Sequence, residues 1–134
     1  MKLPAALILA AALAGCAAER PPVMSADEED RLAAELRDYR QDGPAVACVS
    51  QRDLTGNRSV GEGALIFSGH GGRLWVNRPP AGCPALETGR ALVTRTTTTR
   101  LCRGDIASVV EPTTGMGYGG CGLGDFTPYR RVGG

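Results

Sequence analysis

The fold is decided in the middle of the chain, where residues 64–78 read ALIFSGHGGRLWVNR. Two runs of strand-forming residues, at 64–68 and 73–78, flank the tetrapeptide Gly69-His70-Gly71-Gly72. Such runs, separated by a short loop that contains glycine, are typical of a β-hairpin. Because proline cannot donate a ladder hydrogen bond, Pro79-Pro80 ends the second strand. We therefore expect an antiparallel hairpin at the centre of the domain.

Short β runs continue on both sides of this hairpin. The 19 Gly, the 9 Pro and an aromatic content of 4% indicate many turns and short strands rather than long packed helices. Strands are expected at residues 46–50, 64–68, 73–78, 91–96, 100–102, 106–111 and 126–131, with a Gly-rich connection at 115–124. The expected core side chains are Val46, Ile66, Leu74, Val76, Leu92, Ile106 and Val110. Residues 44–131 are thus predicted to form a small antiparallel sheet or barrel.

One helix is expected before the β domain, over residues 25–43. Ser25 followed by Glu28 makes a capping box, and acidic residues at 27–30 suit the positive end of a helix dipole. Gly43-Pro44 ends the helix. Its apolar stripe is narrow, because only Leu32, Leu36 and Tyr39 fall on one side. Loose docking on the β domain is favoured over a solvated stalk.

The N-terminus resembles a bacterial lipoprotein signal peptide. Met1-Lys2 precedes an apolar run too short to span a bilayer, and the run ends in the lipobox-like sequence Leu13-Ala14-Gly15-Cys16. The resemblance implies that residues 1–15 are removed, that Cys16 carries the lipid and that residues 16–24 form a tether. It places the protein in the cell envelope, with the outer membrane facing the periplasm favoured because Ala17 follows the cysteine. The alternative is an ordinary secretion signal in which Cys16 has no role.

Four cysteines remain for the folded domain, namely Cys48, Cys83, Cys102 and Cys121. An even number in an exported chain indicates two disulfides. A zinc site is the alternative, but no two cysteines have the Cys-x-x-Cys spacing of a zinc knuckle. Three pairings are open; we favour Cys48 with Cys121 and Cys83 with Cys102, which would join the first strand to the last and close the middle.

The order of these cysteines, with the motifs Cys83-Pro84-Ala85-Leu86 and Cys102-Arg103-Gly104-Asp105, resembles a family of small exported proteobacterial lipoproteins of unknown function. The resemblance covers roughly residues 45–131. It implies a disulfide-bonded β domain and an envelope location, and it implies no reaction.

Two short motifs are better explained by structure than by ligand binding. Gly115-x-Gly117-x-x-Gly120 matches a dinucleotide fingerprint, but it is not followed by a helix signal or by the acidic residue about 20 positions on. Arg103-Gly104-Asp105 spells an adhesion tripeptide, yet a turn in which Asp105 accepts backbone N–H bonds fits its place beside Cys102. We expect no nucleotide, no cofactor and no metal.

The charge distribution argues against nucleic acid as a partner. The formal net charge is +1 at pH 7, and the acidic residues are concentrated before the β domain. Residues 43–134 carry ten Arg and six acidic residues, an excess of +4, which is small for a nucleic-acid surface.

Few residues are suited to catalysis. His70 is the only histidine and lies in the predicted hairpin loop, where a general base would lack a fixed position. No serine lies in a Gly-x-Ser-x-Gly elbow. Asp105, Glu111 and Asp125 are the candidate carboxylates for a glycan-acting hydrolase, which is a remote alternative.

The favoured function is therefore a non-catalytic binding or interaction module, anchored to the membrane through lipidated Cys16. Its candidate binding surface consists of Arg73, Trp75, Arg78 and Arg95, for an anionic glycan, a lipid head group or an envelope protein. Trp75 alternates to the face opposite Leu74 and Val76, so it is expected under the helix or exposed at the surface. The alternative function is an inhibitor of an envelope-directed hydrolase such as lysozyme, by analogy with other small disulfide-bonded lipoproteins.

Overall fold

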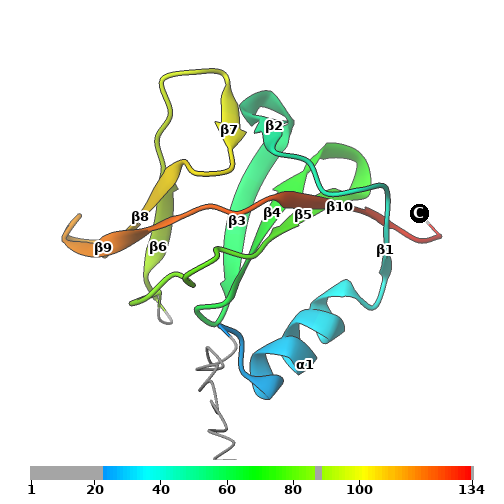
Figure 1. Cartoon of the computed structure of the whole chain (residues 1–134), viewed down its shortest axis with the longest axis horizontal. Helices are drawn as coiled ribbons and strands as arrows, with labels where there is room; N and C mark the ends of the chain where they lie inside the picture. The colour runs from blue at the N-terminus through cyan, green and yellow to red at the C-terminus, as the bar shows by residue number, and fades with distance from the viewer. Residues whose placement is uncertain (1–22, 87–88, 134) are drawn as a thin grey trace, which may run out of the picture.

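The computed structural model describes residues 23–86 and 89–133 (Figure 1). The lipobox, Cys16 and most of the expected tether lie outside the described residues. The elements are α1 (Ala26–Leu36), β1 (Tyr39–Gln41), β2 (Cys48–Ser50), β3 (Leu54–Val60), β4 (Ala64–Gly69), β5 (Arg73–Asn77), β6 (Ala91–Thr94), β7 (Arg100–Cys102), β8 (Ile106–Val110), β9 (Gly117–Gly122) and β10 (Phe126–Arg131). Within the described ranges, no helix is long and apolar enough to cross a bilayer.

The strands form three antiparallel sheets. The largest has five strands in the order β1-β10-β5-β4-β3, the second pairs β6-β8-β9, and the third pairs β2 with β7. The predicted class, mainly β with one helix, is confirmed. The sheets do not close into a barrel, because β3 and β6 end their respective sheets and no ladder joins them in the described part of the chain.

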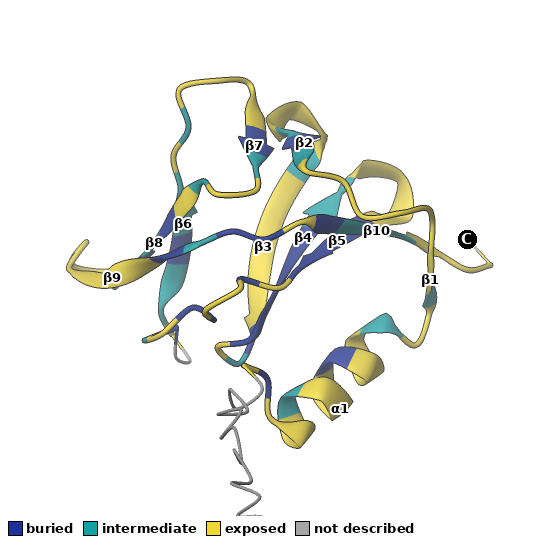
Figure 2. Cartoon of the chain, in the orientation of Figure 1, coloured by how far each residue is buried: buried dark blue, intermediate teal, exposed yellow. Residues whose placement is uncertain are grey.

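The centre of the five-stranded sheet, formed by β4 and β5, is buried on both faces, which explains the continuous apolar runs of the central hairpin. Leu65, Phe67 and Trp75 point into an inner core shared with the two smaller sheets. Ile66 and Leu74 point the other way, into a second core beneath α1. The hairpin prediction is confirmed, and Figure 2 shows β4 and β5 as the most continuously buried strands. Trp75 lies on the face opposite Leu74 and Val76, as predicted, but the expected position under the helix or at the surface is wrong, because Trp75 is buried in the inner core.

Helix α1 begins as predicted and ends early. Ser25 Oγ accepts from the Glu28 amide and the Glu28 carboxylate accepts from the Ser25 amide, which confirms the capping box. The helix stops at Leu36 instead of residue 43, because Tyr39–Gln41 leaves the helical path and pairs with β10. Docking is confirmed, since Leu32 is only 2% exposed and packs in the second core.

Besides β1, which falls within the expected helix, two further strands, β3 and β9, were not predicted. β3 has the sequence LTGNRSV and is exposed along most of its length, while β9 is the glycine-rich GYGGCG that we expected to be a connection. Both are edge strands held by ladder hydrogen bonds to one neighbour. An edge strand that buries few side chains lacks the apolar alternation that marks a strand in a sequence.

The predicted core is correct in part. Ile66, Leu74, Val76 and Leu92 are buried, whereas Val46 is 39% exposed, Ile106 is 61% exposed and Val110 is half-buried. In β8 it is Ala107 and Val109 that face the inner core. Because side chains alternate between the two faces of a strand, Ile106 and Val110 point the other way. Val46 lies outside the ladders and forms only an isolated bridge with Phe126.

The two expected disulfides form, but the favoured pairing is wrong. The bonds join Cys48 to Cys102 and Cys83 to Cys121. Cys48 and Cys102 are directly opposite in the β2–β7 ladder, with 4.0 Å between their Cα atoms. The pairing therefore follows from strands that are distant in sequence and adjacent in the fold.

Candidate functional site

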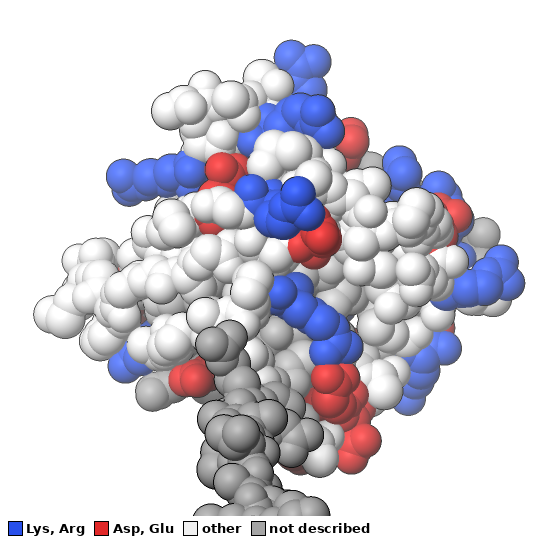
Figure 3. Space-filling view, in the orientation of Figure 1, with Lys and Arg blue, Asp and Glu red and all other residues white. Residues whose placement is uncertain are grey.

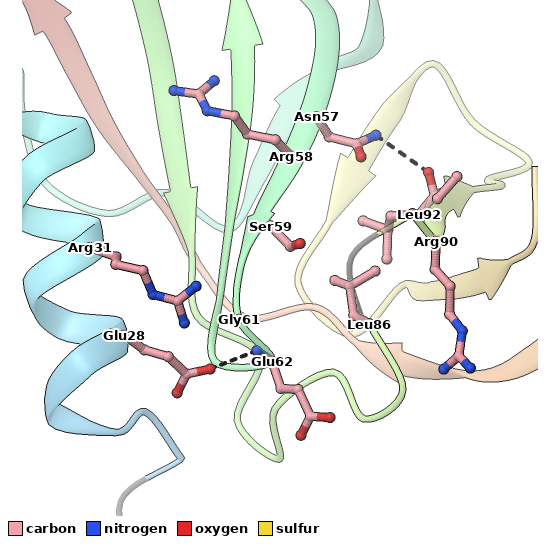
Figure 4. Close-up of a pocket in the computed structure, with 12 residues that line it drawn as sticks. Glu28, Arg31, Asn57, Arg58, Ser59, Gly61, Glu62, Leu86, Arg90 and Leu92 are labelled. Atoms are coloured by element: carbon pink, nitrogen blue, oxygen red, sulfur yellow. Dashed lines mark hydrogen bonds between the residues drawn. The ribbon is translucent and has the colours of Figure 1, made fainter.

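Two of the unpaired sheet edges, those of β3 and β6, face each other across a cleft of about 720 Å³ (Figure 4). One wall comes from β3, the opposite wall from the start of β6 and the loop before it, and α1 lies beside the β3 wall. The lining side chains include Glu28 and Arg31 of α1, Asn57, Arg58 and Ser59 of β3, and Leu86, Arg90 and Leu92 of the opposite wall.

Backbone hydrogen-bonding groups line this cleft because each edge strand is paired on one side only. β3 pairs with β4, and β6 pairs with β8. Among the described residues, one hydrogen bond joins the two edges, from Asn57 Nδ2 to the Leu92 carbonyl oxygen at 3.5 Å. An unpaired edge is a template for a further strand, so the cleft presents two such templates to a ligand between them.

The Glu28 carboxylate fixes the helix to the mouth of the cleft. It accepts from the Ser25 amide and from the Glu62 amide, both at 2.8 Å. These backbone hydrogen bonds, to Ser25 first and then Glu62, lower the pKa of Glu28 below its ordinary value of 4.5. Glu28 therefore links α1 to the turn between β3 and β4.

Two arginines of the cleft are also oriented by contacts within the chain. Arg58 donates to Glu35 at 2.8 and 3.1 Å and to Ser68 Oγ at 3.1 Å. The Arg90 guanidinium lies 3.8 Å from the centre of the Tyr118 ring and donates to the Ala85 carbonyl oxygen at 2.7 Å. The cleft thus combines fixed cations with exposed backbone edges and the apolar Leu86 and Leu92, an arrangement suited to binding.

A second groove, of about 420 Å³, lies under the loop between β6 and β7. It is lined by Arg95, Cys102, Asp105 and the three threonines Thr96, Thr97 and Thr98. The loop is held by its own side chains: Thr96 Oγ1 accepts from the Thr98 amide at 3.0 Å, and Thr98 Oγ1 donates to the Arg100 carbonyl oxygen at 2.9 Å.

The four residues of the predicted binding surface do not form one patch. Arg73 stacks over Trp75 at 5.5 Å and lines a groove with it, at the opposite end of β5 from Arg78. Arg78 pairs with Glu29 at 2.6 and 3.1 Å. Arg95 lies in the groove under the β6–β7 loop, and the Cys48–Cys102 disulfide separates that groove from the one of Arg73 and Trp75.

The ion pair of Arg78 joins α1 to the end of β5. The hydrogen bond from Arg78 lowers the pKa of Glu29, and the same contact raises the pKa of Arg78. Arg78 is thus engaged in docking the helix, a role that the sequence did not indicate.

The candidate carboxylates of the remote hydrolase hypothesis each have a local partner. Asp105 Oδ2 accepts from the Cys102 amide at 2.8 Å, which confirms the predicted turn. Asp125 pairs with Arg103 at 2.9 Å, and Glu111 accepts from the Thr113 hydroxyl at 3.1 Å. His70 is exposed in the turn between β4 and β5.

Within residues 23–86 and 89–133, no group of three or more His, Cys, Asp or Glu side chains could hold a metal ion. The fold and the cleft define a small disulfide-bonded β domain whose two facing sheet edges are unpaired. Comparison with protein-family models, with curated proteins and with solved structures found no match for this chain.

Proposed function

We propose that this chain is a lipid-anchored, non-catalytic binding module of the cell envelope, and that the cleft between β3 and β6 binds an extended peptide segment of another envelope protein. The observation that carries the proposal is that the free edges of β3 and β6 face each other and that, among the described residues, one side-chain hydrogen bond joins them. A peptide strand in the cleft would pair with one of the two edges, a recognised mode of peptide binding.

The side chains around the edges supply the selectivity that backbone pairing lacks. In an added strand, alternate side chains point to opposite sides. Those on one side would meet Arg58 and Arg31, and those on the other would meet Leu86 and Leu92. Because Arg31 and Arg58 already pair with Asp27 and Glu35, the proposal favours peptides that alternate polar residues with apolar ones.

The envelope location is supported by three features of the chain. Its N-terminus resembles a lipoprotein leader, its cysteine motifs resemble those of small exported lipoproteins, and its four remaining cysteines form two disulfides. Disulfides of this kind persist in oxidising compartments.

The peptide proposal is tested by selection from a phage-displayed random peptide library on the mature domain. We expect enriched peptides with alternating polar and apolar residues, and the amide NMR shifts that change on titration should lie in β3 and β6. Ser59→Trp, which fills the cleft from the β3 wall, should abolish binding.

The matched control is Thr55→Trp, an exposed residue of the same strand that does not line the cleft. It should bind the selected peptides as the wild type does. The proposal would be contradicted if peptides were enriched equally on the wild type and on Ser59→Trp, or if no peptide were enriched. NMR shift changes confined to strands other than β3 and β6 would also contradict it.

A further inference from the structure

We infer a second binding site, for an anionic glycan polymer, at the end of the domain that carries β2, β7 and the β6–β7 loop. This site is separate from the peptide cleft, and its proposed ligand has a different chemistry. Its orientation relative to the membrane rests on the lipid anchor of the proposed function.

Three arginines lie on neighbouring segments at this end. Arg100 is opposite Ser50 in the β2–β7 ladder, and Arg52 follows two residues later in the turn after β2. Arg95 is adjacent to Thr96, whose hydroxyl donates to the Arg100 carbonyl oxygen at 3.1 Å. Three segments that are separate in the sequence thus bring these cations to one end.

These three arginines differ from most others in the domain. Arg31, Arg58, Arg78, Arg103 and Arg130 each lie between 2.6 and 3.2 Å from a carboxylate oxygen. Arg52, Arg95 and Arg100 are exposed and make no ion pair with any described residue. An unpaired guanidinium keeps its donors available for the bidentate recognition of a carboxylate or phosphate.

The groove next to these cations favours a carbohydrate among anionic ligands. Threonine hydroxyls at 96–98 and the Asp105 carboxylate line it together with Arg95. Asp105 uses Oδ2 to accept from the Cys102 amide, so its other oxygen can accept from a sugar hydroxyl. A ligand that carries both hydroxyls and carboxylates matches this mixture of hydroxyl, carboxylate and guanidinium groups.

The anchor geometry argues against the head groups of the protein's own membrane. The described chain begins at Val23, beside Gly82 and the acidic first turn of α1. In Figure 1 this region lies at the opposite end of the molecule from β2 and β7. Figure 3 shows basic side chains projecting from the upper end of this face and acidic ones near α1 at the lower end.

Seven residues lead from Cys16 to Val23, a reach of at most about 25 Å even when fully extended. A lipid on Cys16 would therefore keep Val23 within this distance of the membrane surface, and the three arginines lie at the other end of the domain. A polymer located beyond the membrane surface is the ligand we infer for that end.

The test is co-sedimentation of the mature chain with purified peptidoglycan sacculi, a glycan polymer that carries carboxylates. We expect the wild type to sediment with sacculi, and to sediment less with vesicles of phosphatidylglycerol and phosphatidylethanolamine. The triple variant R52Q/R95Q/R100Q should bind sacculi about tenfold or more weakly, because charge-assisted hydrogen bonds are lost.

The charge-matched control is R37Q/R40Q/R130Q, which removes three arginines that line neither the cleft nor the groove. It should bind sacculi as the wild type does, and so should Ser59→Trp, which separates this site from the peptide cleft. The inference would be overturned if both triple variants lost sacculus binding equally, or if R52Q/R95Q/R100Q lost none. Stronger binding of the wild type to vesicles than to sacculi, or no binding to sacculi at all, would also overturn it.

Discussion

At the scale of single residues, Asn77 takes the place of a missing strand partner. Its side chain is fully buried at the end of β5, where Nδ2 donates to the Gly124 carbonyl oxygen at 2.8 Å and Oδ1 accepts from the Gly124 amide at 2.9 Å. The side-chain amide thereby satisfies both backbone groups of a residue that lies between β9 and β10. This explains a polar residue at the end of an otherwise apolar strand.

Replacing Asn77 by Ala should lower the free energy of unfolding by about 2–4 kcal/mol, because two buried backbone groups of Gly124 lose their partners. The measurement is urea denaturation followed by far-UV circular dichroism. Asn57→Ala is the control, since Asn57 is exposed and makes one hydrogen bond of 3.5 Å, and it should cost less than about 0.5 kcal/mol. Similar losses in the two variants would show that the Asn77 contacts contribute little.

Two glycines of the same segment should respond in opposite ways to a methyl group. A Cβ on Gly124 would lie 2.5 Å from the Arg78 carbonyl oxygen, whereas a Cβ on Gly122 would meet no atom within 4 Å. Gly124→Ala should therefore destabilise the domain by about 1–3 kcal/mol through overpacking. Gly122→Ala should be neutral or stabilise by up to about 1 kcal/mol, because it restricts the unfolded chain. Thermal unfolding of both variants measures this, and a stable Gly124→Ala would refute the close approach.

At the scale of elements, local features were predictable and distant pairings were not. The capping box is written in four adjacent residues, and the structure confirms it. The extent of the helix is not local, because residues 39–41 are drawn into a sheet by β10, which lies about 90 residues later. The disulfide connectivity likewise depends on which strands become neighbours, and four cysteines in a sequence leave that open.

The link between α1 and the β3–β4 turn should make stability depend on pH through Glu28. Its folded-state pKa is lowered by the Ser25 and Glu62 amides, so its contribution is present above the unfolded value near 4.5 and is lost as the pH falls through the folded-state pKa. Glu28→Gln keeps one acceptor oxygen of two and should cost about 1 kcal/mol at pH 7.

The check is a pair of urea titrations of the wild type and Glu28→Gln at pH 7 and pH 3. The difference in unfolding free energy should shrink at pH 3, because the wild-type carboxyl is then largely protonated in the unfolded chain and increasingly so in the folded one. Glu29, whose pKa is lowered by its hydrogen bond from Arg78 and raised by the Glu28 charge, is present in both proteins, so only the part of its titration that depends on Glu28 enters the difference. A difference that is the same at both pH values would contradict the role of the Glu28 carboxylate.

The two disulfides should be reduced in order of their exposure. Cys83 is fully buried and Cys121 nearly so, whereas Cys48 and Cys102 are half-buried. Dithiothreitol under native conditions should therefore reduce Cys48–Cys102 first, as read by alkylation and peptide mass mapping. In the chain-entropy account, loops closed over 54 and 38 residues each stabilise the fold by about 4 kcal/mol. Initial reduction of Cys83–Cys121 would contradict this order.

At the scale of the whole molecule, the central hairpin could be predicted because it is apolar on both faces, and the candidate site could not. The peptide cleft exists because β3 and β6 do not pair, and a pairing that is absent leaves no pattern in a sequence. β3 is polar because most of it stays exposed, as Figure 2 shows, so its residues resemble those of a loop. Of the predicted surface, only Arg95 lies in a groove to which we assign a ligand.

The two cores lie on opposite faces of the same sheet, so they should unfold together. β4 and β5 place alternate side chains in each core. Trp75 reports on the inner core, whereas Leu32 belongs to the second core beneath α1. Leu32→Ala should lower the free energy of unfolding by about 2–4 kcal/mol, as is usual for a buried leucine. Since Trp75 is the only tryptophan, its fluorescence should show the same shifted midpoint as circular dichroism.

Leu36→Ala is the graded control for this prediction. Leu36 is only partly buried against the second core, so its replacement should lower the free energy of unfolding by less than that of Leu32. If Leu32→Ala melts the helix while the Trp75 transition keeps its wild-type midpoint, α1 is an independent layer and the cooperative account fails. Coincident transitions would mean that removing the Leu32 side chain beneath the helix also destabilises the inner core on the other face of the sheet, through the strands of the central hairpin. The inner core includes Leu92 of the cleft wall.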